Sequence, residues 1–387
     1  MIEKGTKCVK QKRKKGSIDI PFLTIMLVML IFGLIMVFSA SAPSAFYQEG
    51  DKLYYIKRQL IFSAIGFVAM FVTMRMDLRI IKQFSGVLCI ISFALLLLVL
   101  FIGSSGGGAQ RWLAIGPIRF QPSELAKFAL IFYFAKRISE QPKNTIQNFT
   151  RGLLPYIGII GAFVGVMILQ DHLSGAVVIF ISSMIVLLAG GANLLHFAVM
   201  GGIGVAALIP AALLESYRFK RLLAFWDPFA DKLGDGYQII QGLYAIASGG
   251  LFGLGLGQSR QKFLYIPEAH NDYIYAIICE ELGFVGALAV AILFLFLVTR
   301  GIYIAIHAPN TFTRLSVFGI ISVIGLQYIV NVGVVTASIP NTGMQLPFFS
   351  AGGSSLIFIM AAMGVVLNVS QYISTGGKKA AEKEKAL

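Results

Sequence analysis

A few ionisable residues interrupt otherwise apolar stretches of this chain, and they are the first candidates for chemistry. Asp272 stands at the start of the apolar run 271–299, where water and hydrocarbon would meet. Partial burial disfavours a charged carboxylate and so moves it toward the proton affinity that a general base needs. Aspartate is also a common cap at the start of a helix. Position alone therefore leaves a catalytic and a capping role for Asp272 open.

Glu124 and Lys127 form a second candidate group, in a segment that begins with Gln121 and Pro122. Residues three apart lie on one face of a helix, so the two side chains can form an ion pair. Such a pair can simply hold the end of a helix. It can equally line a polar cavity in which Lys127 meets an anionic ligand, because charges at membrane depth face protein or water.

Two other polar pairs are expected to be structural. Glu280 and Glu281 lie deeper in the same apolar run as Asp272, so at least one of them must face protein or water. Asp171 and His172 are adjacent in a short turn between two apolar runs. Two neighbouring ligands lack the spacing of a metal site, so we expect a solvated turn there.

Two glycine-rich segments also stand out. The segment 248–257 is not followed by Gly-Lys-Ser/Thr and so does not indicate a nucleotide-binding loop. The segment 340–355 carries two prolines and three glycines between two apolar runs. It predicts non-helical backbone at membrane depth, which is tolerated only against protein or a water-filled cavity.

The elements that position these residues are membrane spans. Of the 387 residues, 57% are hydrophobic and 13% charged, which excludes a water-soluble globular protein. Apolar runs of about 18 or more residues recur, and about 20 helical residues cross a bilayer. We predict an all-α, polytopic membrane protein with about ten transmembrane helices. The predicted spans are 19–41, 58–75, 84–103, 121–138, 153–170, 174–191, 193–214, 271–299, 314–336 and 346–371.

The distribution of Lys and Arg predicts the orientation. With ten spans, both termini lie on one side, and 20 of the 32 Lys and Arg fall on the cytoplasmic side against 11 outside. The net charge of +14 thus reflects topology in a cytoplasmic (inner) membrane, and no nucleic acid partner is expected. The predicted organisation is a basic cytoplasmic tail (1–18), a ten-span domain (19–371) with a large extracytoplasmic loop segment (215–270) between spans seven and eight, and a cytoplasmic tail (372–387).

The outer loops supply cations that could bind phosphate, namely Arg111, Arg119, Arg218, Lys220, Arg221, Arg260 and Lys262. Within the long loop, residues 238–256 are apolar enough to form one or two helices at the membrane surface. The three cysteines have no paired spacing, which indicates neither a disulfide nor a metal site. These features suit an outward polar cavity for an anionic, lipid-linked substrate, and leave open whether the protein transports it or reacts with it.

Several short motifs together resemble the SEDS family of shape, elongation, division and sporulation proteins, most closely its FtsW and SpoVE branch. The similarity extends from about residue 19 to residue 371. The motifs that carry it are Gly-Ala-Gln-Arg-Trp-Leu at 108–113, Gln-Pro-Ser-Glu at 121–124, Gly-Tyr-Gln at 236–238, Gly-Leu-Gly-Gln-Ser at 255–259, Pro-Glu-Ala-His-Asn-Asp at 267–272, Glu-Glu-Leu-Gly at 280–283 and Leu-Pro-Phe at 346–348.

The resemblance implies a peptidoglycan glycosyltransferase that polymerises lipid II into glycan strands at the outer face of the cytoplasmic membrane, in cell division or sporulation. It also implies a class B penicillin-binding protein as transpeptidase partner, with other division or sporulation membrane proteins. Asp272 matches the family's essential aspartate. The residues expected to bind substrate are Glu124, Lys127, Arg111, Gln121, His270, Lys262 and Arg221.

In the implied reaction, Asp272 accepts a proton from the 4-hydroxyl of the acceptor sugar, which attacks the donor with inversion and expels undecaprenyl pyrophosphate. Lys127, Arg111 or a divalent cation (Mg²⁺ or Mn²⁺) would stabilise the leaving group, and no organic cofactor is expected. One alternative is a lipid-linked oligosaccharide flippase, although no related half-repeats are visible. Another is a non-catalytic scaffold for cell-wall enzymes.

Overall fold

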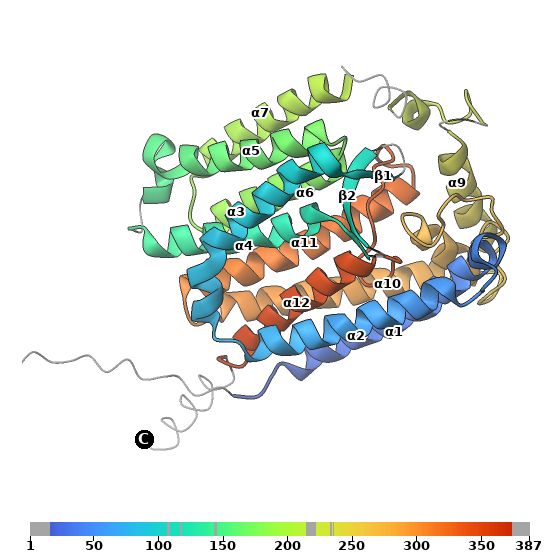
Figure 1. Cartoon of the computed structure of the whole chain (residues 1–387), viewed down its shortest axis with the longest axis horizontal. Coiled ribbons are helices and arrows are strands. Elements are labelled where there is room, and N and C mark those ends of the chain that lie inside the picture. Colours follow the sequence, from blue (N-terminus) through green and yellow to red (C-terminus); the bar gives the residue numbers. More distant parts are fainter. Residues whose placement is uncertain are drawn as a thin grey trace, which may run out of the picture.

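The protein is a bundle of long helices with a small sheet at one end (Figure 1). The computed structural model describes residues 16–106, 109–116, 118–142, 145–213, 222–232, 234 and 236–373. The long helices in this part of the chain are α1 (Ile20–Glu49), α2 (Tyr54–Arg75), α3 (Leu78–Ile102), α4 (Pro122–Glu140), α5 (Leu154–Leu169), α6 (Leu173–Ala189), α7 (Leu194–Leu213), α9 (Tyr237–Gly249), α10 (Ile274–Ile306), α11 (Thr311–Val335) and α12 (Gly353–Ser370).

Each predicted span coincides with one of these helices, and α9 lies within the predicted long loop. Within the described residues, seven helical segments are long and apolar enough to cross a membrane. They are Ile20–Glu49, Tyr54–Arg75, Leu78–Ile102, Phe149–Leu169, Ile274–Ile306, Thr311–Val335 and Gly353–Ser370. The protein is therefore a multi-pass membrane protein, while a total of ten spans stays a prediction. Both predicted tails fall mainly outside the described residues.

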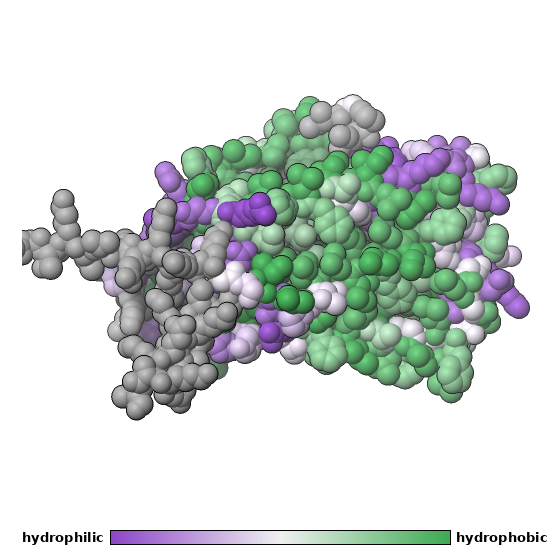
Figure 2. Space-filling view, turned by 90° about the horizontal axis from the view of Figure 1, so that it is seen from below, coloured by the Kyte–Doolittle hydropathy of each residue, from purple (hydrophilic) through white to green (hydrophobic). Residues whose placement is uncertain are grey.

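The surface has the division that a bilayer imposes. Apolar residues form a broad band across the middle of the face in Figure 2, and hydrophilic residues gather toward its two ends. Large side chains such as Ile31, Phe101 and Leu295 are exposed on the helices of this band. Because water would penalise so much exposed apolar surface, these side chains are stable only against lipid or a partner.

Polar side chains cap the starts of two of the helices. The Asp19 side chain accepts a hydrogen bond from the Phe22 backbone N–H at the start of α1. Asn310 and Thr313 form a capping box at the start of α11. Two short turns, η1 (Thr145–Gln147) and η2 (Phe149–Leu153), precede α5. The Asp19 and Asn310 side chains thus satisfy backbone N–H groups that have no partner within the helix.

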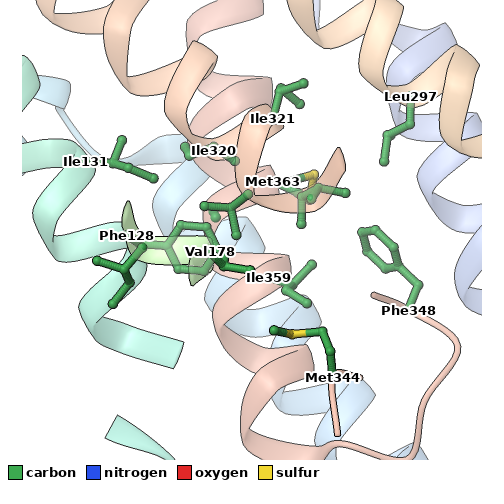
Figure 3. Close-up of a cluster of buried hydrophobic side chains, with 14 of the residues drawn as sticks. Phe128, Ile131, Val178, Leu297, Ile320, Ile321, Met344, Phe348, Ile359 and Met363 are labelled. Carbon is green, nitrogen blue, oxygen red and sulfur yellow. The ribbon is translucent and has the colours of Figure 1, made fainter. Parts of the chain in front are cut away.

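The core lies where α4, α6, α11 and α12 pack together. Phe128, Val178 and Ile320 meet there from three of these helices (Figure 3). Met344 and Phe348 enter from the non-helical chain between α11 and α12, and both are buried. This segment was predicted to be non-helical and to lie against protein or a water-filled cavity, and the structure confirms that prediction, since most of its residues are buried or line a cavity. Helix α12 consequently begins at Gly353, seven residues after the start of the predicted span.

The structure adds a small antiparallel sheet that the all-α prediction did not include. Its strands are β1 (Ser104–Gly106), β2 (Ala109–Ile115) and β3 (Ile118–Phe120), in the order β1-β2-β3. Ala114 pairs with Arg119 across the turn at Gly116, whose φ is 62°. The strands are too short for a clear alternating pattern, which is why sequence alone did not indicate them.

Non-helical segments gather at one end of the bundle. The sheet, α9 and the chain that follows α9 lie at the end opposite to the start of α1 (Figure 1). Between α9 and α10 the backbone turns repeatedly, as expected for the long loop. Helix α10 is itself interrupted at Gly283, where φ is 65°. We refer to this end of the molecule as the α9 end.

Candidate active site

A large polar cavity opens at the α9 end and has a volume of about 1340 Å³. Its walls come from α1, α2, β2, the start of α4, the chain before α10 and the chain before α12. The sequence-predicted residues that line it are Arg111, Gln121, Glu124, Lys262, His270 and Asp272. Residues separated by up to 161 positions in the sequence thus share one chamber. A chamber of this size can hold the sugar and phosphate groups of a large substrate.

Asp272 is half-buried in the cavity wall, two residues before α10. The N-cap of α10 is Tyr273, whose side chain makes no capping hydrogen bond, so Asp272 lies one residue before the cap position. The backbone of Asp272 is held by α11, because the Asn331 side chain donates a hydrogen bond of 2.8 Å to the Asp272 carbonyl oxygen. Asp272 therefore presents its carboxylate to the cavity from a fixed backbone.

Arg111 reaches the same part of the cavity from β2. A Cβ atom built on Gly343 would lie 3.1 Å from Oδ2 of Asp272 and 3.6 Å from Nη1 of Arg111. The three residues therefore meet at one point of the wall, with a cation beside the carboxylate. Arg119, also on the small sheet, lines the cavity as well. The unpredicted sheet thus places two cations in the cavity wall, of which Arg111 lies near Asp272.

Glu124 and Lys127 form the predicted ion pair, with 2.7 Å between Nζ and Oε1. Both are buried, and Ser355 of α12 donates to the other Glu124 oxygen at 2.8 Å. In the part of the chain that the structure describes, Glu124 lines the cavity and Lys127 does not. The pair therefore joins α4 to α12 beneath the cavity. Direct contact between Lys127 and a ligand stays a prediction, since it requires the pair to open.

His172 was expected to lie in a solvated turn, but the structure buries it. Its side chain is buried and lines the cavity, where Nε2 lies 3.1 Å from Ser123 Oγ and 3.3 Å from Gln121 Nε2. Asp171 takes a positive φ of 54°, which turns the chain between α5 and α6 and lets His172 point inward. The prediction was wrong because a two-residue turn carries no sequence sign of the wall that another helix provides.

Lys262, in the chain between α9 and α10, is buried. Its ammonium group is 2.7 Å from Glu281 Oε1 and also donates to Ser39 Oγ and to the Gly257 carbonyl oxygen. All three of its donors thus have partners within the chain. Glu280, beside Glu281, accepts hydrogen bonds from Ser259 and from nearby backbone N–H groups. The structural role expected for the two glutamates is confirmed, and Lys262 shares it.

His270 lines the cavity with its ring against that of Tyr55, at 4.2 Å between centroids. Burial lowers the pKa of His270 to about 4, against an opposing effect of Glu268. At neutral pH the ring is therefore uncharged, and it can offer a substrate a hydrogen bond and a flat surface but no positive charge. Arg221, the remaining predicted site residue, lies outside the described residues.

Asn331 is the main residue that sequence reasoning missed. It is fully buried in α11 and donates hydrogen bonds to the carbonyl oxygens of Asp272, at 2.8 Å, and of Met344, at 2.6 Å. One amide group thus joins the two chain segments that form the wall around the carboxylate. An asparagine inside an apolar span was an available signal, because polar groups at membrane depth are costly unless they bond to something.

Replacing Asn331 by alanine is expected to lower turnover more than substrate affinity. The change removes two hydrogen bonds to backbone carbonyl groups, and a buried carbonyl group left without its partner costs about 1–3 kcal/mol. Stability in detergent, kcat and KM should be measured together. Gln327→Ala is the control, since Gln327 lies one turn earlier, is equally buried and donates a hydrogen bond to the Met344 sulfur at 3.8 Å. An unchanged kcat in a folded Asn331→Ala protein would contradict this positioning role.

The comparisons with known proteins show the family to which this chain belongs. The model of the cell cycle protein family of FtsW, RodA and SpoVE matches residues 20–375. The chain therefore belongs to this family, which confirms the resemblance found in the motifs. It is 44% identical over 361 residues to stage V sporulation protein E of Bacillus subtilis, covering 93% of this chain and 98% of that protein. It is 39% identical over 360 residues to the probable peptidoglycan glycosyltransferase FtsW of Geobacter sp. strain M18, covering 92% and 98%.

Two solved structures share the fold. A chain from a study of structural coordination of polymerization and crosslinking by a peptidoglycan synthase complex matches with a TM-score of 0.75 and 30% identity, over 91% of this chain and 97% of that one. The rod shape determining protein RodA of Thermus thermophilus matches with a TM-score of 0.68 and 27% identity, over 91% and 96%. The helical architecture is therefore that of RodA.

Proposed function

We propose that this protein is a peptidoglycan glycosyltransferase that polymerises lipid II into glycan strands. The observation that carries the proposal is the position of Asp272, whose carboxylate faces a large polar cavity beside Arg111. Relatives that cover almost the whole chain are named as probable enzymes of this class. The direct test is to incubate the purified protein with lipid II in vesicles and to resolve the glycan chains formed.

The residues of the cavity support a single displacement. The Asp272 carboxylate takes the proton from the 4-hydroxyl of the acceptor sugar, and the resulting oxygen attacks the anomeric carbon of the donor. A new glycosidic bond forms as the bond from that carbon to the pyrophosphate oxygen breaks. Undecaprenyl pyrophosphate leaves with the electron pair, and Arg111 and Arg119 offset its growing negative charge from the cavity wall. General-base assistance of this kind is worth about 10²- to 10⁴-fold in rate.

A divalent cation at this site remains a proposal. No group of three or more His, Cys, Asp or Glu side chains that could hold a metal occurs in the described part of the chain. Mg²⁺ binds readily through one or two carboxylates together with substrate phosphates and water. Asp272 or another carboxylate of the cavity wall would hold such an ion together with the pyrophosphate, and the ion would supply positive charge beside the leaving group.

The setting proposed for the enzyme is the cytoplasmic membrane, with both termini inside and the α9 end outside. The excess of Lys and Arg on the predicted inner side supports this orientation. A class B penicillin-binding protein is the proposed partner, because the matching chain of known structure comes from a peptidoglycan synthase complex. Polymerisation and crosslinking would then take place on the same side of the membrane.

Replacing Gly343 by alanine is expected to lower the polymerisation rate by about 10- to 100-fold, as small misplacements of reacting groups do. The new methyl group would lie 3.1 Å from Oδ2 of Asp272 and would displace it. The control is Gly50→Ala, because Gly50 has a similar φ of 71° and no atom within 4 Å of the added carbon. Equal losses in both variants would attribute the effect to backbone strain and contradict the proposed geometry.

A further inference from the structure

A second hollow, mostly apolar, runs beside the polar cavity. It has a volume of about 750 Å³ and lies between the last turns of α1 and residues 256–264. Its lining includes Ile35, Phe38, Ala42 and Phe46 from α1, and Leu256 and Phe263 from the loop. We refer to this hollow as the α1 groove. Phe38, Phe46 and Phe263 are exposed, so the groove is open toward the apolar surface of the protein.

The α1 groove adjoins the polar cavity. Lys262 and Leu264 belong to the walls of both. The Lys262 ammonium also binds the two sides of the groove together, because it donates to Ser39 of α1 at 3.2 Å and to Gly257 of the loop at 2.7 Å. The groove is therefore held in shape by buried hydrogen bonds and needs no ligand to form.

A ligand that fills both spaces must be polar at one end and apolar along the rest. We propose that the α1 groove binds the polyprenyl chain of a lipid-linked sugar pyrophosphate whose head group occupies the polar cavity. Lys52 lines the groove, with its ammonium 5.2 Å from the centre of the Phe46 ring, and adds a cation for the phosphate end. This inference rests on the proposed function, since it assigns the chain of the same substrate.

Photolabelling of the full-length protein in vesicles tests the groove without any catalytic step. The probe is undecaprenyl pyrophosphate with a diazirine in its chain. Labelled peptides are expected to map to 35–47 and 256–264, and unlabelled undecaprenyl pyrophosphate should compete while phosphatidylglycerol should not. Equal competition by phosphatidylglycerol would mean that the groove holds ordinary lipid and would overturn the proposal, as would labels spread evenly over the exposed face of α1.

Two tryptophan variants provide the matched comparison. Ala42→Trp fills the groove and should weaken labelling about tenfold, equivalent to 1.4 kcal/mol. Val28→Trp places the same side chain on the exposed surface of α1 outside the groove and should leave labelling unchanged. Equal labelling of both variants would overturn the proposal that the polyprenyl chain binds in the α1 groove. Asp272→Asn should be labelled like the wild type, so loss of catalysis and loss of chain binding can be told apart.

Discussion

Asp272→Asn is expected to abolish polymerisation of purified lipid II while the protein still folds and binds substrate. Asparagine has almost the same shape as aspartate but cannot accept the proton of the attacking hydroxyl. The loss should reach at least the 10²- to 10⁴-fold that a general base provides. Fold and backbone position should persist, because Asn331 holds residue 272 through its carbonyl oxygen, which the substitution leaves in place.

The control for this variant is Glu268→Gln, which changes another carboxylate of the cavity wall four residues earlier. Glu268 hydrogen-bonds to Asn271 at the surface and is expected to affect polymerisation only slightly. Polymerisation by Asp272→Asn at the wild-type rate would reject the general base. A mild loss, together with intact partner binding, would instead favour a scaffold. A flippase would be favoured if the wild-type protein makes no glycan but translocates the lipid-linked substrate, and if Asp272→Asn abolishes that translocation.

Lys262→Met is expected to destabilise the protein strongly. It leaves Glu281, fully buried, without its ion-pair partner. Removing one partner of a buried pair typically costs about 3–5 kcal/mol, because the remaining charge has no compensation. The lost hydrogen bonds to Ser39 and Gly257 also free the loop that closes one side of the cavity. The thermal midpoint in detergent and the rate of polymerisation should both fall.

Lys57→Met is the matched control, since Lys57 pairs with Asp51 at the same 2.7 Å but the two side chains are 62% and 43% exposed. An exposed pair contributes about 0–1 kcal/mol, so stability should change little. The double variant Lys262→Met with Glu281→Gln should recover most of the stability. If it recovers stability but not substrate affinity, Lys262 also binds substrate, as its sequence position had indicated. An unchanged midpoint in Lys262→Met would contradict the structural role.

Much of the architecture could be predicted because a bilayer imposes strong rules on sequence. A helix that crosses about 30 Å of hydrocarbon needs a long apolar run, and each of the ten predicted runs overlaps a helix of the described chain, with ends that differ by up to eight residues. The same rule made Asp272 and Glu124 conspicuous, since charges are rare beside such runs. The prolines and glycines of 340–355 likewise predicted the non-helical segment that carries Gly343.

The relations between distant segments could not be predicted in this way. The small sheet that carries Arg111 has strands of three to seven residues, too short for a recognisable period. The burial of His172 depends on α4, and that of Lys262 depends on α1 and α10. Packing between segments decides which cation forms a buried ion pair and which one faces the cavity. The local sequence around each cation does not indicate this.

By itself the sequence determined the apolar helices, the family and the acidic residue on which the proposed chemistry depends, because each is encoded in local composition or a short motif. Only the tertiary structure decided that Lys262 holds a loop, that Asn331 supports Asp272, and that an apolar groove adjoins the polar cavity. These features arise where segments far apart in the chain meet. Their energies depend on distances that a one-dimensional pattern does not contain.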